Sequence, residues 1–301
     1  MSKFVFEPEN MKLSRAQEKL REASVAISQE DPKEIGFVCR SMVAASMPHS
    51  NTKGIVFNRK SKNITLSIVG NERAGGLPYG TYPRLILSWL ASEVVKKKER
   101  EIVLGSSLSS FMKKIGLSVT GGRWGTVPRF KDQMQRLFSS VITVGVMDKK
   151  SGEFAHTNLS IAEKSQIFWN PSHPEQIDLF KSKIFIGEMF FKETMNAPIP
   201  IDIRALNVLK SSSLALDIYF WLTYRMSYII GRVEIPFDNL HTQFGAGYPI
   251  TSHGRYEFKR KFLIQLEKVL FLYPQAKVEI KETHICLKSS PTHVPRNLLN
   301  I

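Results

Sequence analysis

The spacing of apolar residues between positions 85 and 162 predicts an alternation of helices and strands. Apolar side chains recur every three or four residues in three stretches, which predicts amphipathic helices over 85–98, 107–115 and 123–139. Short runs rich in β-branched residues predict strands over 101–104, 140–147 and 154–162. Gly116 ends the second helix, because glycine readily adopts the left-handed conformation found at helix C-termini. The expected order is therefore helix, strand, helix, turn, helix and hairpin.

The same order of elements recurs after residue 201. The pattern predicts helices over 214–230, 238–244 and 252–272, a strand over 233–236, and closing strands over 277–281 and 284–288. One shift of 132 positions (221 minus 89) aligns the two stretches without a gap. It pairs Trp89 with Trp221, Val103 with Ile235, Leu108 with Leu240, Phe130 with Phe262, and Gln133 with Gln265. Because elements and residues agree at a single shift, the sequence indicates an internal repeat.

This order of elements is that of a winged helix-turn-helix, in which the third helix enters the major groove and the hairpin forms the wing. We therefore predict an α+β fold with tandem winged helix-turn-helix domains and an N-terminal helical extension. The expected boundaries are 1–50 for the extension, with helices over 14–28 and 33–45, 51–195 for the first winged-helix domain with a leading hairpin, and 196–301 for the second. A generic α+β domain without DNA contact has the same element order and stays the alternative.

Basic residues recur at equivalent positions of the two predicted third helices. The shift of 132 pairs three of them: Arg123 with Arg255, Arg129 with Lys261, and Arg136 with Lys268. At about 100° per residue, the second and third pairs are expected to face away from the apolar stripes of their helices. Outward cations on a groove helix neutralise phosphates, and arginine also pairs with guanine. The two helices in register therefore predict DNA contact, and a solvated charged face is the alternative.

Three further basic residues are candidates for DNA contact. Arg260 lies near the edge of the apolar stripe of its helix, on which we place Tyr256. Lys149 and Lys150 lie at the tip of the hairpin predicted over 140–162, where a wing would reach phosphates or the minor groove. A solvated turn is the alternative for this lysine pair. Trp124 is predicted either to pack under the turn before its helix or to lie near DNA.

The charge of the chain favours an acidic partner. The 301 residues include 42 Lys and Arg against 27 Asp and Glu, a formal net charge of +15 with a pI of about 9.7. Such a surplus points to nucleic acid first and to an acidic membrane surface second. No run of about 18 uncharged apolar residues occurs, which excludes a transmembrane helix. Without a secretory signal, and with only Cys39 and Cys286, the chain is expected in the reducing cytoplasm.

The sequence lacks the motifs that would indicate catalysis. No Gly-Lys dipeptide occurs, so there is no P-loop for nucleotide binding, and no His-x-His pair offers the metal ligands of a nickase. We therefore expect no catalytic residue, no metal site and no cofactor, and we expect that the chain is not an enzyme.

Three segments resemble the RepA-type plasmid replication initiator family. They are Leu77-Pro78-Tyr79-Gly80-Thr81-Tyr82-Pro83-Arg84, continuing to Leu90, then Glu101-Ile102-Val103-Leu104-Gly105-Ser106-Ser107-Leu108-Ser109, and Gly121-Gly122-Arg123-Trp124-Gly125-Thr126. The similarity is strong over 54–195 and extends to about 285. The first 50 residues carry no motif that we can assign.

The resemblance implies sequence-specific binding of double-stranded DNA at a plasmid origin, opening of nearby A·T-rich DNA, and recruitment of host initiator and helicase proteins. It also implies repression of the protein's own gene, and with it plasmid copy control, and a possible homodimer. The third helices and the wing would carry the DNA contacts. A winged-helix transcriptional repressor that binds an operator is the alternative function.

Overall fold

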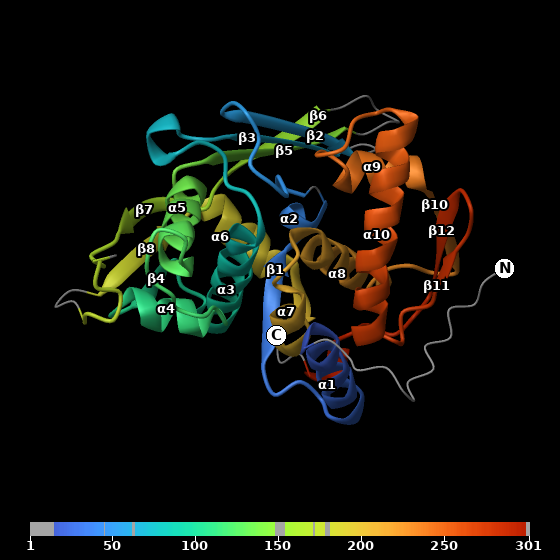
Figure 1. Cartoon of the computed structure of the whole chain (residues 1–301), viewed down its shortest axis with the longest axis horizontal. Helices are drawn as coiled ribbons and strands as arrows, with labels where there is room; N and C mark the ends of the chain where they lie inside the picture. Colours follow the sequence, from blue (N-terminus) through green and yellow to red (C-terminus); the bar gives the residue numbers. More distant parts are fainter. Residues whose placement is uncertain are drawn as a thin grey trace.

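The computed structural model describes residues 15–44, 46–61, 64–147, 154–170, 172–177 and 181–298, which form a mixed α+β fold (Figure 1). One order of elements occurs twice. The first unit, residues 81–186, consists of α3 (Thr81–Lys97), β4 (Glu101–Gly105), α4 (Leu108–Lys114), α5 (Thr126–Phe138) and the closing strands β7 (Ala162–Gln166) and β8 (Ser182–Ile186). The second unit, residues 213–288, consists of α8 (Ser213–Met226), β10 (Arg232–Pro236), α9 (Phe237–Phe244), α10 (Ser252–Leu272), β11 (Val278–Ile280) and β12 (His284–Lys288). The predicted helices and first strand of each unit are confirmed, with ends shifted by a few residues.

Each unit ends in a three-stranded antiparallel sheet, and the two sheets have the same strand order. The orders are β4-β8-β7 and β10-β12-β11, so the last strand of each unit lies in the middle. Ile102 pairs with Ile184 in the first sheet, and Ile235 pairs with Ile285 in the second. All four side chains are buried. The two units therefore share strand pairing as well as the order of their elements.

The hairpin predicted as the wing of the first unit belongs to a different sheet. Strands β5 (Val141–Met147) and β6 (Phe154–Ser160) form, but they extend a four-stranded sheet of order β2-β3-β5-β6 with β2 (Val56–Ser61) and β3 (Ile64–Val69). Buried Ile142 pairs with buried Ile68 across β5 and β3. The strand β4 pairs with β8 instead, so the expected wing position of this hairpin is wrong. Alternating burial predicts a strand, but it does not predict which strand lies beside it.

The N-terminal region is not purely helical, which corrects the prediction for residues 1–50. Helix α1 (Arg15–Gln29) forms, but the helix predicted over 33–45 is replaced by strand β1 (Ile35–Cys39) and the short α2 (Arg40–Ala44). The strand β1 pairs antiparallel with β9 (Pro198–Asp202), which contains Pro198 and Pro200. Two prolines fit in this pairing because β9 has only one neighbouring strand. Tertiary pairing has overridden local helix propensity here.

The N-terminal region bridges the two units. Apolar side chains of α1 pack on the core of the second unit, and the hydroxyl of Ser24 donates to the carbonyl of Phe271 at the end of α10 (2.7 Å). From β1, Phe37 packs on Ala91 and Val95 of α3, and its backbone N–H donates to the hydroxyl of Ser92 (2.8 Å). The 3₁₀ turn η1 (Glu72–Ala74) precedes the first unit. Helices α6 (Glu188–Asn196) and α7 (Ile203–Leu209) lie between the units along the chain, and η2 (Arg296–Leu298) lies near the C-terminus.

Each unit has its own aromatic core beneath its long helix. Phe130 of α5 lies 5.7 Å from the ring of Phe111, and Phe262 of α10 lies 5.6 Å from the ring of Phe244. All four rings are almost fully buried. Burial of such side chains contributes about 1.5–3 kcal/mol each. The apolar faces of α5 and α10 are thus fixed inward.

Candidate nucleic-acid interface

The turn that leads into α5 presents Arg123 and Trp124 to solvent. The hydroxyl of Thr126 donates to the carbonyl of Ser118 (2.7 Å), and the hydroxyl of Thr120 accepts from the N–H of Thr126 (2.9 Å). Any side chain at Gly125 would bring its Cβ within 2.2 Å of the carbonyl oxygen of Thr120. The turn is therefore tightly closed.

At the tip of this turn, the side chains of Arg123 and Trp124 lie together. The guanidinium carbon of Arg123 is 5.3 Å from the centre of the Trp124 ring, and Trp124 is 81% exposed. The ring therefore does not pack under the turn, which excludes one of the two predictions for Trp124.

The start of α10 has a related construction in the second unit. The hydroxyl of Thr251 accepts from the N–H of Gly254 (3.1 Å) and caps the helix. A side chain at Gly254 would place its Cβ 2.1 Å from the carbonyl oxygen of Pro249. Arg255 forms an exposed ion pair with Asp238 of α9 (2.7 Å), and Tyr256 is 64% exposed. The placement of Tyr256 on the apolar stripe is therefore wrong.

The segments near the two helix starts share one sequence step at the shift of 132, although Trp124 lies just before α5 and Tyr256 lies within α10. This shift superposes Gly122-Arg123-Trp124 on Gly254-Arg255-Tyr256. Each unit thus places an arginine followed by an exposed aromatic ring at the N-terminal end of its long helix. The alignment of Trp124 with Tyr256 at the shift of 132 is the signal in the sequence that could have identified both rings as candidate contact residues.

Four of the other predicted cations face solvent. Arg129 is exposed on α5, where its Nε donates to the carbonyl of Gly125 (3.1 Å). On α10, Lys261 and Lys268 are exposed, and Arg260 is exposed with an ion pair to Glu257 (2.9 Å). Hydrogen bonding from Arg260 lowers the pKa of Glu257. Within the described parts of the chain, Arg123, Arg129, Lys261 and Lys268 form no ion pairs with carboxylates.

The prediction that Arg136 faces outward is wrong. Its side chain is only 14% exposed, and its Nε donates to the carboxylate of Asp132 (2.9 Å). The guanidinium also lies 5.4 Å from the Tyr79 ring and would be 3.0 Å from a Cβ at Gly75. The segment around η1 covers this end of α5, which a helical wheel could not reveal. Lys149 and Lys150 lie outside the described residues.

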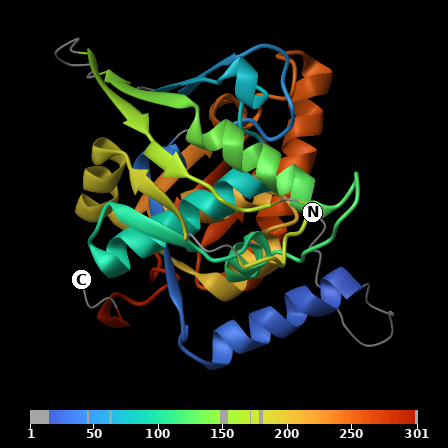
Figure 2. The same cartoon turned by 90° about the vertical axis from the view of Figure 1, so that its left-hand side faces the viewer.

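Both long helices lie toward one face of the molecule, although Figure 1 shows them toward opposite ends of its longest axis. In Figure 2, α5 (green) and α10 (orange) lie toward the right of the view, and the turn before α5 projects from the same side. A double helix could therefore approach both helix starts from one direction. Cations near the start of such helices are positioned as in proteins that contact bases and phosphates.

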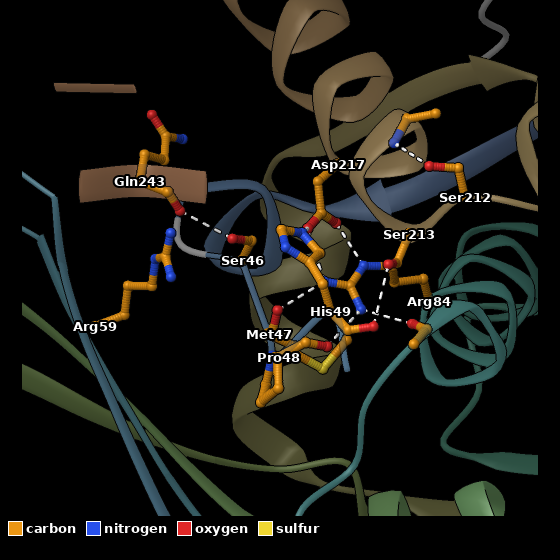
Figure 3. Close-up of polar contacts among 12 residues, drawn as sticks. Ser46, Met47, Pro48, His49, Arg59, Arg84, Ser212, Ser213, Asp217 and Gln243 are labelled. Carbon is orange, nitrogen blue, oxygen red and sulfur yellow. Dashed lines mark hydrogen bonds and ion pairs between the residues drawn. The ribbon is translucent and has the colours of Figure 1, made fainter. Parts of the chain in front are cut away.

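A buried polar cluster fixes the relation between the units (Figure 3). We call it the inter-unit cluster, and its members are Met47, Pro48, His49, Arg84 and Asp217. Arg84 of α3 is 2% exposed, and its guanidinium binds both carboxylate oxygens of Asp217 of α8 (2.6 and 2.7 Å). Its other N–H groups donate to the carbonyls of Met47 (2.7 Å), Pro48 (3.2 Å) and Gly80 (2.6 Å). All five guanidinium donors are thereby satisfied.

His49 completes the inter-unit cluster. Its Nε2 lies 2.8 Å from Asp217, and burial lowers the pKa of His49 although the carboxylate opposes this effect. Burial alone would raise the pKa of Asp217, but the charge of Arg84 and hydrogen bonds from His49 and Arg84 lower it. At neutral pH the carboxylate is therefore ionised, and a neutral His49 donates to it through Nε2.

Residues beside the inter-unit cluster add further contacts between the same segments. The hydroxyl of Ser46 donates to the carbonyl of Gln243 (2.9 Å), and the hydroxyl of Ser213 donates to that of His49 (3.3 Å). Arg59 of β2 is buried near α9, and burial lowers its pKa to about 10. These contacts hold α3, α8 and α9 against the loop of residues 46–49. The N-terminal ends of α5 and α10 therefore have a defined separation.

Comparisons with known proteins give a sequence family and a fold. A family model described as "Plasmid encoded RepA protein" matches residues 77–235, which is more than half of the chain.

Among solved structures, a crystal structure of domain 2 and domain 3 of RctB is similar, with a TM-score of 0.50 and 10% sequence identity. The similarity covers 83% of this chain and 97% of that one. At this identity the likeness concerns the fold alone. No curated protein sequence matches the chain significantly. Within the described residues, no helix combines the length and apolar character needed to cross a membrane.

Proposed function

Because this chain belongs to the family of plasmid-encoded RepA proteins, we propose that it is a plasmid replication initiator that binds origin DNA sequence-specifically through two winged-helix units. The repeated order of helices and strands, with the same strand order in both sheets, supports the winged-helix assignment. In each unit the long helix, α5 or α10, would enter the major groove.

One observation carries the proposal. The starts of the two long helices present the same Gly-Arg-aromatic step, and both helices have exposed cations that bind no carboxylate in the described structure. A solvated surface helix needs no such repetition. A protein that contacts two half-sites does need it, because each half-site must be reached by an equivalent helix.

The proposed activity works through binding and strain in the DNA. Bending or kinking a site costs a few kcal/mol, and contacts between cations and phosphates offset this cost. Opening of the origin, recruitment of host initiator and helicase proteins, homodimer formation and control of copy number are further parts of the proposal. We place the protein in the cytoplasm with the plasmid. We propose no catalytic residue, metal or cofactor. A nick in the origin DNA after incubation of the protein with Mg²⁺ would contradict the proposal that the protein is not an enzyme.

Replacing Arg129 or Lys261 with alanine should flatten the salt dependence of DNA binding. Each phosphate contact contributes about −0.9 to the slope of log affinity against log salt concentration. Each substitution should therefore reduce the steepness of the slope by about one unit. The measurement is a salt titration of wild type and variants on DNA that flanks the gene, by fluorescence anisotropy.

The matched control is Lys33→Ala. Its side chain is 89% exposed beyond the end of α1, away from both long helices, so the slope should stay at the wild-type value. If the slopes of Arg129→Ala and Lys261→Ala equalled that of Lys33→Ala, these faces of α5 and α10 would not be the DNA-binding surface.

A transcriptional repressor with the same fold is the alternative function. It would bind an operator but would not support replication. The test is to place the gene and its flanking DNA on a plasmid that lacks its own origin. Maintenance of this plasmid is expected of an initiator, and its loss, together with intact DNA binding in vitro, would favour the repressor.

A further inference from the structure

Trp124 and Tyr256 are large aromatic side chains left in solvent at equivalent positions of two units. They are 81% and 64% exposed, and their positions differ by the repeat shift (256 minus 124). The next pair of aromatic residues that the repeat shift aligns, Phe130 and Phe262, is fully buried. The chain therefore has room for aromatic rings in each core, and yet it keeps one exposed ring at each helix start.

Both rings are held by closed backbone structures. Trp124 lies between Thr120 and Thr126, whose hydrogen bonds close the turn just before α5. Tyr256 lies in the second turn of α10, after the Thr251 cap and the close contact of Gly254 with Pro249. Because the backbone on either side is fixed, each ring is presented at a defined place and loses little conformational freedom on binding.

The surroundings of the rings combine apolar surface with positive charge. Arg123 lies over the Trp124 ring, and Arg255, which directly precedes Tyr256, forms an exposed ion pair with Asp238 (2.7 Å). Ile250, which is 78% exposed, adds apolar surface just before the Thr251 cap. A partner that offers anionic groups together with an apolar group fits these surroundings, and an anion would replace Asp238 as the partner of Arg255. In the major groove the phosphates are the anions, and the C5 methyl group of thymine is an apolar group on a base edge.

We propose that Trp124 and Tyr256 are thymine-reading residues, with each ring packing against the C5 methyl group of one thymine in its own half-site. The neighbouring arginine then contacts the adjacent phosphate or a guanine. This inference rests on the proposed function, which it extends by naming a base and the residues that read it.

The experiment uses the full chain and duplex DNA. Wild-type protein first selects its sites from a pool of duplexes of random sequence. Each thymine of the selected duplex is then replaced, one at a time, with deoxyuridine, which keeps base pairing and removes only the methyl group. At one thymine in each half-site, this replacement should weaken wild-type binding by about fourfold, the effect of losing one buried methyl group.

The variants Trp124→Ala and Tyr256→Ala identify which ring reads which thymine. Each should bind the unmodified duplex more weakly and should lose its sensitivity to deoxyuridine at one position, while it keeps the sensitivity at the other. Trp124→Phe and Tyr256→Phe keep an aromatic ring and should keep both sensitivities. Since both rings are exposed, all four variants should unfold at the wild-type temperature.

Tyr228→Ala is a matched control outside the long helices. Tyr228 is 47% exposed and lies 5.3 Å beneath the guanidinium of Arg225, the same distance as in the Arg123–Trp124 pair. Its removal should leave affinity and both sensitivities unchanged.

The outcomes separate this inference from the proposed function. If wild type selects no common sequence, the proposed function itself is overturned. If wild type selects a site but the alanine variants keep both deoxyuridine sensitivities, the function stands and thymine reading is overturned. If single-stranded DNA of the same sequence bound as tightly as the duplex, thymine reading would also be overturned, because the rings would then stack on unpaired bases.

Discussion

Replacing Asp217 with alanine should lower the free energy of unfolding by about 3–5 kcal/mol, because Arg84 would stay buried without its charged partner. Arg84 is 2% exposed and binds both oxygens of this carboxylate. The loss includes the hydrogen bond from His49 (2.8 Å). Urea-induced unfolding, followed by circular dichroism at pH 7, measures the change.

Asp238→Ala is the matched control for this prediction. Asp238 also binds an arginine at 2.7 Å, but both of its ion-pair side chains are exposed, at 68% for Asp238 and 48% for Arg255. Exposed pairs contribute about 0–1 kcal/mol, so this variant should unfold almost like wild type. An Asp217→Ala variant as stable as Asp238→Ala would mean that the inter-unit cluster does not hold the two units together.

Acidification should destabilise the protein by about 3 kcal/mol between pH 6.5 and pH 4 through His293 alone. Burial lowers the pKa of His293 to about 4, whereas an unfolded chain titrates near the ordinary value of 6.5. Below pH 6.5 the unfolded chain therefore binds a proton at His293, whereas the folded chain does not bind this proton until the pH approaches about 4. The contribution of the neutral His293 to the free energy of unfolding is complete above pH 6.5 and falls as the pH drops toward this value.

Burial keeps His293 neutral, and its hydrogen bonds fit the neutral ring. Its Nδ1 lies 2.8 Å from the hydroxyl of Tyr219, which itself accepts from the N–H of Asp202 (2.8 Å). Its Nε2 lies 3.1 Å from the carbonyl of Leu272 at the end of α10 and donates to it. The Tyr219 hydroxyl must therefore donate to an unprotonated Nδ1, and a proton on this nitrogen would break the chain of hydrogen bonds.

Unfolding in urea at pH 7 and pH 4.5 tests this prediction. His293→Gln should be less stable than wild type at pH 7 and should show a weaker pH dependence in this range. Part of the dependence should remain, because burial also lowers the pKa values of His49 and His241. His253→Gln replaces an exposed histidine and should keep the wild-type dependence. The prediction fails if His293→Gln and His253→Gln give the same pH profile.

The elements that sequence reasoning located well are those with long apolar stripes. α5 and α10 were found within a few residues, because their buried positions, such as Phe130 and Phe262, recur at helical spacing. The internal repeat was found for the same reason. Equivalent cores require similar residues at equivalent positions, and one shift then aligns them.

The errors arose where a distant segment decides the environment of a residue. Arg136 is on the polar side of its helix, but the segment around η1 covers it. The residues of β1 were expected to be helical, and they form a strand because β9, about 160 positions later, supplies a partner. Tyr256 matches the apolar stripe in type, but it lies on the face of α10 opposite the buried Phe258 and Phe262.

The repeat, the long helices, the excess of positive charge and the cations that recur on both helices can be predicted from the chain, because each depends on spacing or composition. Three features could be known only from the folded molecule: which hairpin joins which sheet, which arginines stay exposed, and how Arg84 and Asp217 join the two units. These features depend on contacts between residues far apart in sequence. Such contacts are selected by the shape and burial of the whole molecule, which local periodicity does not contain.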